Sequence, residues 1–153
     1  MDMKKRVLFL IVFLGITSFK SVGSATAYLN CVSESGRTAF KAEIQDIDGG
    51  LEKAEITIDG VKLNFTEEDN SNIIFDSKNG VFTIAIESNP SKDFSKYRFL
   101  KFWAIPKSFK TIIENNTEGK YEFRAKMYST EPRKGKDLQT PEIEMNCELK
   151  YKI

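Results

Sequence analysis

The chain has 153 residues and a nearly neutral formal charge of +1, from 23 basic and 22 acidic residues. General nucleic-acid binding needs a net basic surface or a dominant basic patch, so this balance argues against that class of function. The chain contains no histidine. That absence excludes the Ser-His-Asp and Cys-His arrangements of hydrolases and every metal site with an imidazole ligand.

Residues 1–27 have the three parts of a secretory signal peptide. These are the basic head Lys4-Lys5-Arg6, the apolar run Val7 to Ile16 and the small-residue site Ala25-Thr26-Ala27. The apolar run covers about ten residues, whereas a membrane-spanning helix needs roughly 20. We therefore expect cleavage after Ala27 and a mature chain, residues 28–153, that has no transmembrane segment. We expect a periplasmic or extracellular location in a bacterium.

Lipid anchoring of the mature chain is an alternative, because Cys31 lies just after the expected cut. A lipidated cysteine would become the new first residue, and the residue before it is normally small. Asn30 is bulky, which argues against this alternative.

The charge of the expected mature chain differs between its two halves. Residues 28–153 carry a net −2, but residues 28–95 sum to −7 and residues 96–153 to +5. A basic second half favours an acidic protein or another envelope component as partner.

Apolar residues of the mature chain alternate with polar residues, which predicts strand after strand and no convincing helix. The expected inward-facing sets are Phe40/Ala42/Ile44, Ala54/Ile56/Ile58, Val61/Leu63/Phe65, Phe82/Ile84/Ile86, Tyr121/Phe123/Ala125/Met127 and Ile143/Met145/Cys147/Leu149/Tyr151/Ile153. Further strands are expected at 97–105 and near 109–113. Asp59-Gly60 and Asn79-Gly80 lie between such runs and predict tight hairpins.

This pattern predicts a single antiparallel all-β domain of about eight to ten strands, spanning residues 28–153. Local hairpins favour an up-and-down β-barrel, and a two-sheet β-sandwich is the alternative, because both produce the same alternation. Cys31 and Cys147 fall on inward-facing positions of the first and last strands. A disulfide between them would join the terminal strands of an exported protein.

No residue set in the chain predicts a catalytic centre or a cofactor. The cluster Asp46, Asp48 and Glu52 is a weak calcium candidate, but it lacks the ligand spacing of an EF-hand. The favoured interpretation is a turn between a strand that ends at Gln45 and one that begins at Lys53. Glu67-Glu68-Asp69 is the starting point for an alternative, a hydrolase that works with carboxylates alone. Its neighbours Asn70 to Asn72 favour an exposed loop instead.

Residues 94–110 interleave aromatic and basic side chains more densely than any other segment. We take its aromatic residues as candidate binding residues: Tyr97, Phe99, Phe102, Trp103 and Phe109. Such mixing suits an anionic ligand, a glycan, single-stranded nucleic acid or a membrane surface. The alternative is a central strand whose aromatic side chains fill the core while the basic stems cover its outside.

The segment 129–142 is the longest irregular stretch and carries Arg133, Lys134 and Lys136. Long loops on rigid β scaffolds often carry recognition. The sequence thus favours an exported, non-enzymatic binding module for a small apolar or amphipathic ligand or for a macromolecular partner. A secreted interaction or inhibitor module that acts through this loop is the alternative.

Overall fold

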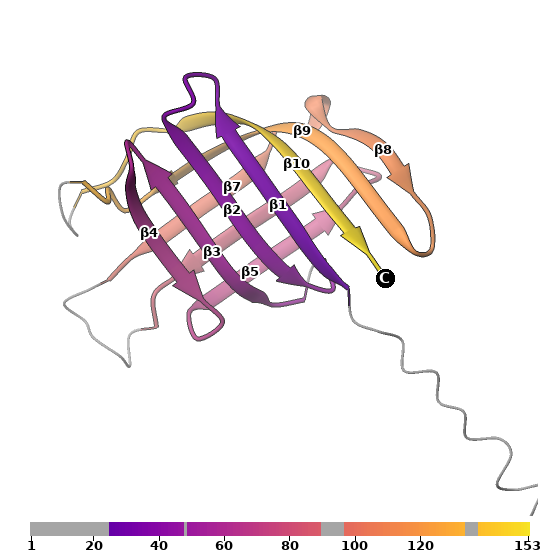
Figure 1. Cartoon of the computed structure of the whole chain (residues 1–153), viewed down its shortest axis with the longest axis horizontal. Coiled ribbons are helices and arrows are strands. Elements are labelled where there is room, and N and C mark those ends of the chain that lie inside the picture. Colours follow the sequence, from indigo (N-terminus) through magenta and orange to yellow (C-terminus); the bar gives the residue numbers. More distant parts are fainter. Residues whose placement is uncertain (1–24, 48, 90–96, 134–137) are drawn as a thin grey trace, which may run out of the picture.

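The structure, a computed structural model, describes residues 25–47, 49–89, 97–133 and 138–153 (Figure 1). Its strands are β1 (Thr26–Ser33), β2 (Thr38–Gln45), β3 (Leu51–Ile58), β4 (Val61–Thr66), β5 (Asn70–Asp76), β6 (Val81–Glu87), β7 (Phe99–Ala104), β8 (Lys110–Glu114), β9 (Glu118–Ser129) and β10 (Ile143–Lys152). The short 3₁₀ helix η2 (Pro106–Ser108) lies between β7 and β8. Within the described ranges, no helix is long and apolar enough to span a bilayer.

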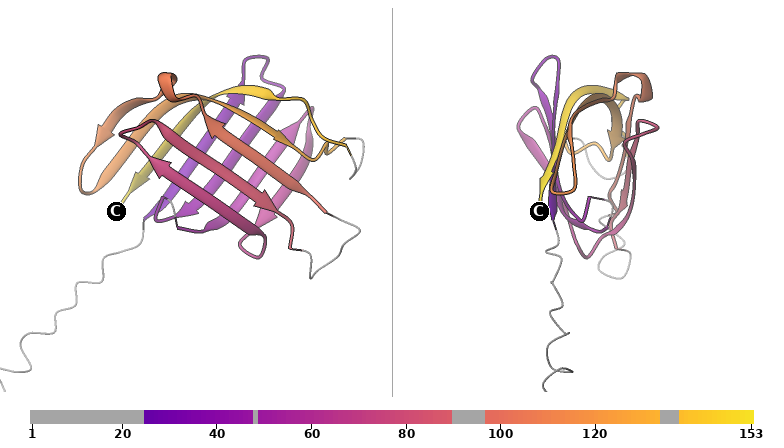
Figure 2. Two further views of the ribbon diagram at one scale, coloured as in Figure 1. Left: turned by 180° about the vertical axis from the view of Figure 1, so that it is seen from behind. Right: turned by 90° about the vertical axis from the view of Figure 1, so that its right-hand side faces the viewer.

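The strands form one antiparallel sheet in the order β4-β3-β2-β1-β10-β9-β7-β6-β5, with β8 paired to β9 outside this path. The sheet folds over on itself into a half-barrel. One layer holds β1 to β4 and the other holds β5 to β7, while β9 and β10 curve from one layer towards the other (Figures 1 and 2). The predicted all-β antiparallel fold is therefore confirmed, with ten strands in the described residues.

Both predicted hairpins are present. Ile58 of β3 pairs directly with Val61 of β4. Asp59 and Gly60 between them both have positive φ, 50° and 82°, as the tightest hairpin turns require. Asn79-Gly80 closes the next hairpin, in which β5 pairs with β6.

The terminal strands lie side by side, as predicted. β1 pairs with β10 along its length, and Cys31 lies directly opposite Cys147. Their Cα atoms are 4.1 Å apart and their side chains form the disulfide. Both residues are buried. The predicted bond between the first and last strands is therefore confirmed.

The half-barrel is open between β4 and β5, the two ends of the strand order. These strands follow one another in the chain, so a closed barrel would pair them. The carboxylate of Asp69, in the turn between them, accepts hydrogen bonds from the backbone N–H of Thr66 at 2.8 Å and of Asn89 at 3.2 Å. Asn89 follows β6, so this hydrogen bond holds the turn against the layer that contains β6. The backbone of the turn therefore does not continue into a pairing between β4 and β5.

The space between the layers is filled by a core of apolar side chains. The alternation predicted for β2, β3, β6 and β9 is confirmed, because each of their inward sets is buried. Phe82, which is fully buried, contacts the rings of Phe75, Phe102 and Phe123 at centroid distances of 5.5 to 5.8 Å.

Candidate functional site

The aromatic residues of segment 94–110 do not all lie on one side of the sheet, because successive residues of β7 point to opposite sides. Phe102 points into the core and is 2% exposed. Phe99 and Trp103 lie at the alternate positions and are half-buried on the outside. Phe109 packs against the core, with its ring 5.0 Å from that of Phe123. Two of the five candidates thus belong to the core, and the other three do not.

We call the four outward-facing rings the outer aromatic face; they are Tyr97, Phe99, Trp103 and Tyr128. The Tyr97 and Phe99 rings stack at 6.2 Å. The Tyr128 ring meets Phe99 edge to face at 6.0 Å and Trp103 at 5.8 Å. Because each ring contacts a neighbour, the four side chains hold one another in fixed positions. Tyr97 is 45% exposed, and the other three are half-buried.

Tyr128 was not among the candidates predicted from the sequence. It lies on β9, directly opposite Lys101 of β7, and no local pattern relates two strands so far apart in the chain. One signal did exist. The outward positions of β9 read Glu122, Arg124, Lys126 and Tyr128, so an aromatic residue ends an otherwise charged face.

Lys101 lies between the outward-facing positions Phe99 and Trp103, and it is exposed. No ion pair in the described part of the chain involves it, whereas Lys126 on the neighbouring strand binds Glu142 at 2.6 Å. Glu87, opposite Phe99 on β6, interacts with the Tyr97 hydroxyl; burial, followed by this carboxylate, raises the pKa of Tyr97. Three rings of the outer aromatic face, those of Phe99, Trp103 and Tyr128, thus flank the exposed Lys101.

Arg133 binds groups of the protein itself. Its guanidinium forms an ion pair with Glu131 at 2.7 Å and another with Asp59 in the β3–β4 turn. Glu131 is buried, and its hydrogen bond to Arg133 raises the pKa of the guanidinium. A hydrogen bond from Arg37 lowers the pKa of Asp59. Arg133 thus fastens this loop to the β3–β4 turn, and Lys134 and Lys136 lie outside the described residues.

Two of the calcium candidates, Asp46 after β2 and Glu52 on β3, contact the first residue of β1 and the residue before it. Asp46 accepts a hydrogen bond from the Ala25 N–H at 3.1 Å, and Glu52 accepts one from the Thr26 hydroxyl at 3.3 Å. Asp48 lies outside the described residues. The predicted turn after Gln45 is confirmed, although β3 begins at Leu51, two residues earlier than predicted.

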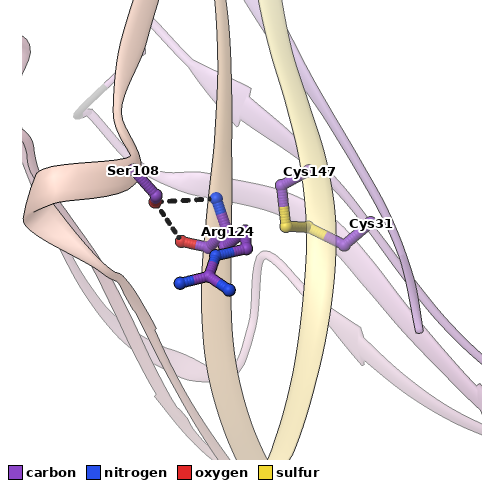
Figure 3. Close-up of a disulfide and its surroundings, with 4 residues drawn as sticks. All are labelled: Cys31, Ser108, Arg124 and Cys147. Atoms are coloured by element: carbon purple, nitrogen blue, oxygen red, sulfur yellow. Dashed lines mark hydrogen bonds between the residues drawn. A yellow bond between two sulfur atoms is a disulfide. The ribbon is translucent and has the colours of Figure 1, made fainter. Parts of the chain in front are cut away.

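An open cleft of about 690 Å³ lies over β9 and β10 beside the disulfide. It exists because β9 changes partner from β7 to β8. Ser108 of η2 lies at this change. Its hydroxyl accepts a hydrogen bond from the Arg124 N–H at 2.8 Å, and its single O–H lies within hydrogen-bond distance of two backbone carbonyls, those of Ile105 at 2.6 Å and Arg124 at 3.1 Å. Figure 3 shows the two contacts with Arg124. The cleft is lined mainly by charged and amide side chains, among them Lys107, Lys110 and Glu122.

Two carboxylates in this cleft, Glu122 and Glu148, are directly opposite each other on β9 and β10. Glycosidases use such pairs, but their general acid is kept protonated by a desolvated environment. Glu122 is exposed, and Glu148 lies between Lys120 at 3.1 Å and Lys150 at 3.7 Å. Neither carboxylate therefore has the desolvated environment of a glycosidase general acid.

Comparison of the chain with protein-family models, characterised proteins and solved structures gives no match.

Proposed function

We propose that the protein is an exported, non-enzymatic binding module whose outer aromatic face receives a protein partner. The observation that carries this proposal is the row of four contacting aromatic rings, three of which flank the exposed Lys101. Large aromatic side chains lose little conformational freedom when they bind, and Trp and Tyr dominate the energetics of protein interfaces. Rings that already contact one another lose less still, because they are ordered before the partner arrives.

Lys101 adds a preference to this surface. Its position among the rings, without an ion pair in the described residues, suits an acidic group of the partner. A charge that becomes partly desolvated on binding contributes to the choice of partner more than to total affinity. We therefore propose an acidic segment as the part of the partner that lies across β7 and β9.

The interior is a weaker candidate for the ligand. The rings of Phe82, Phe102 and Phe123 contact one another between the layers, and each is at most 4% exposed. A small apolar ligand there would have to displace core side chains, at a cost similar to that of disrupting the core. This packing favours the outer surface over a cavity.

Export is the second part of the proposal. A disulfide between Cys31 and Cys147 is compatible with an oxidising compartment, where such bonds persist. Cleavage after Ala27 would leave Tyr28 paired with Lys150 and with Glu43. The mature chain would thus keep the pairing of β1 from its first residue onward.

The test is capture of a partner from the native envelope with the purified protein as bait. The test variant is Trp103→Ala combined with Tyr128→Ala. The matched control is Tyr28→Ala, which removes an exposed aromatic side chain (45% exposed) from the outer face of the other layer. We expect wild type and Tyr28→Ala to capture the same protein, and the double variant to lose it although it remains folded by circular dichroism.

Lys101→Glu tests the acidic preference with the partner purified from that capture. We expect weaker binding, mainly through slower association, and a larger difference from wild type at low salt, because exposed charges are screened over about 10 Å at 0.1 M salt. Equal capture by the double variant would contradict the proposal itself. Unchanged binding by Lys101→Glu would contradict only the acidic preference.

A further inference from the structure

The strand β5 is an edge of the sheet, and its first six residues carry none of the usual protections of an edge. Alternate residues of an edge strand direct their backbone N–H and C=O groups away from the sheet, where another strand can bind them. β5 contains no proline, and its one charged side chain is that of its last residue, Asp76. Ile74, on the outer side of β5, is 53% exposed.

The other edges of the described sheet carry features that hinder strand addition. β4 carries Lys62 at its second position, and this lysine binds Glu55 of β3 at 3.0 Å. β8 begins with Lys110, ends with Glu114 and has an irregular register between Thr111 and Ile113. Charged residues and bulges are common protections of edge strands. The contrast singles out β5 as the edge that is open to pairing.

We propose that β5 pairs with β5 of a second copy of this chain, antiparallel and centred on Ile74, to form a symmetric dimer. In this register Ile74 of one copy faces Ile74 of the other on the outer side. On the inner side Ile73 faces Phe75 of the other copy, and both are half-buried in the single chain. The strand is therefore complementary to itself, as a two-fold interface requires.

The charges that flank β5 are also complementary in this register. Lys78 follows β5 in the next turn, and the acidic turn Glu67–Asp69 precedes β5. Antiparallel pairing places Lys78 of each copy alongside the acidic turn of the other, twice in the symmetric dimer. No pair of like charges is brought face to face between Asn70 and Phe75. The charge pattern thus favours a second copy as the occupant of this edge.

The first test measures the mass of the purified protein in solution over a range of concentrations. We expect a monomer–dimer equilibrium for wild type and a monomer for Ile74→Lys, which would bring two lysines together at the centre of the interface. Lys78→Glu should weaken dimerisation at low salt and have less effect at high salt. A wild-type protein that remains monomeric at the highest concentration would overturn the proposal, as would a dimer that Ile74→Lys leaves intact.

The second test keeps the proposal falsifiable if Ile74→Lys does not fold. Ile74→Cys should form a disulfide between two copies under mild oxidation, because the register places the two cysteines opposite each other. The matched control is Val61→Cys, an exposed position on the other edge strand β4, and we expect it to remain monomeric. Equal cross-linking at both positions, or none at position 74, would overturn the register. Neither test depends on the outer aromatic face.

Discussion

Phe102 and Trp103 are adjacent in the chain and point to opposite sides of β7. Phe102 contacts Phe40, Phe82 and Phe123 inside the half-barrel, whereas Trp103 contacts Tyr128 outside it. The same substitution at neighbouring positions therefore distinguishes a core role from a surface role.

We predict that Phe102→Ala lowers the free energy of unfolding by about 3–5 kcal/mol, the usual cost of removing a buried aromatic side chain. Trp103→Ala should cost clearly less, because its ring is half-buried and leaves no enclosed cavity. Urea denaturation of both variants against wild type gives the two values. Equal losses would show that Trp103 belongs to the core, and the outer aromatic face would then lose its only tryptophan.

Tyr121 makes stability sensitive to alkaline pH. It is 1% exposed, and its hydroxyl donates a hydrogen bond to Glu114 at 3.0 Å. Burial, followed by the Tyr151 hydroxyl and the Glu114 carboxylate, raises its pKa. Below the ordinary tyrosine pKa of about 10 the side chain is neutral in both the folded and the unfolded chain. Above that pH the unfolded chain loses the proton more readily, so stability falls as pH rises.

We predict that Tyr121→Phe flattens this decline between about pH 9 and 12. At neutral pH the same variant should lose about 1 kcal/mol with its hydrogen bond. Urea midpoints of both proteins across this range provide the comparison. Parallel pH profiles for wild type and Tyr121→Phe would mean that other groups cause the alkaline decline.

At the scale of elements, the first and last strands depend on each other. β1 and β10 are paired along their length, and the disulfide between Cys31 and Cys147 closes a sequence separation of 116 residues. A cross-link over so long a loop restricts the unfolded chain and contributes about 4–5 kcal/mol in the chain-entropy account.

We predict that reduction lowers the free energy of unfolding by up to this amount. The double variant Cys31→Ala with Cys147→Ala should behave like the reduced protein and should not respond to reductant. Urea denaturation with and without reductant measures both. An oxidised protein with the same urea midpoint as the double variant would show that strand pairing alone holds the termini together.

At the scale of the whole molecule, the two proposals combine into one surface. Ile74, Thr83 and Trp103 are successive cross-strand neighbours on the outer side of β5, β6 and β7. Pairing of β5 with β5 of a second copy would therefore join the outer surfaces of the two sheets into one continuous surface. With neighbouring strands about 4.8 Å apart, the two Trp103 residues would lie about 24 Å from each other across the pair. A partner with two acidic segments would bind such a dimer more tightly than a monomer.

Much of this architecture is readable from the sequence because strand alternation and turn chemistry are local. Asp59-Gly60 specifies its hairpin within four residues, and the inward position of Cys147 follows from its neighbours alone. The opening between β4 and β5 is not local. It depends on Asp69 reaching Asn89, 20 residues away, and no periodic pattern records such a contact.

The candidate site was predictable only in part, for the same reason. Alternation already places Phe102 and Trp103 on opposite sides of one strand. It does not tell which strand lies next to β7, so the contribution of Tyr128 required the register between β7 and β9. The sequence likewise predicted Arg133 as a recognition residue. In the fold it binds Asp59, which is 74 residues away in the chain.

The most direct measurement of the central claim is hydroxyl-radical footprinting of the protein with and without the captured partner. This method reports the solvent exposure of individual aromatic side chains. We predict that the partner lowers the modification of Trp103 and Tyr128 and leaves Tyr28 unchanged. Unchanged modification of Trp103 and Tyr128, with protection elsewhere on the molecule, would contradict the assignment of the outer aromatic face as the binding site.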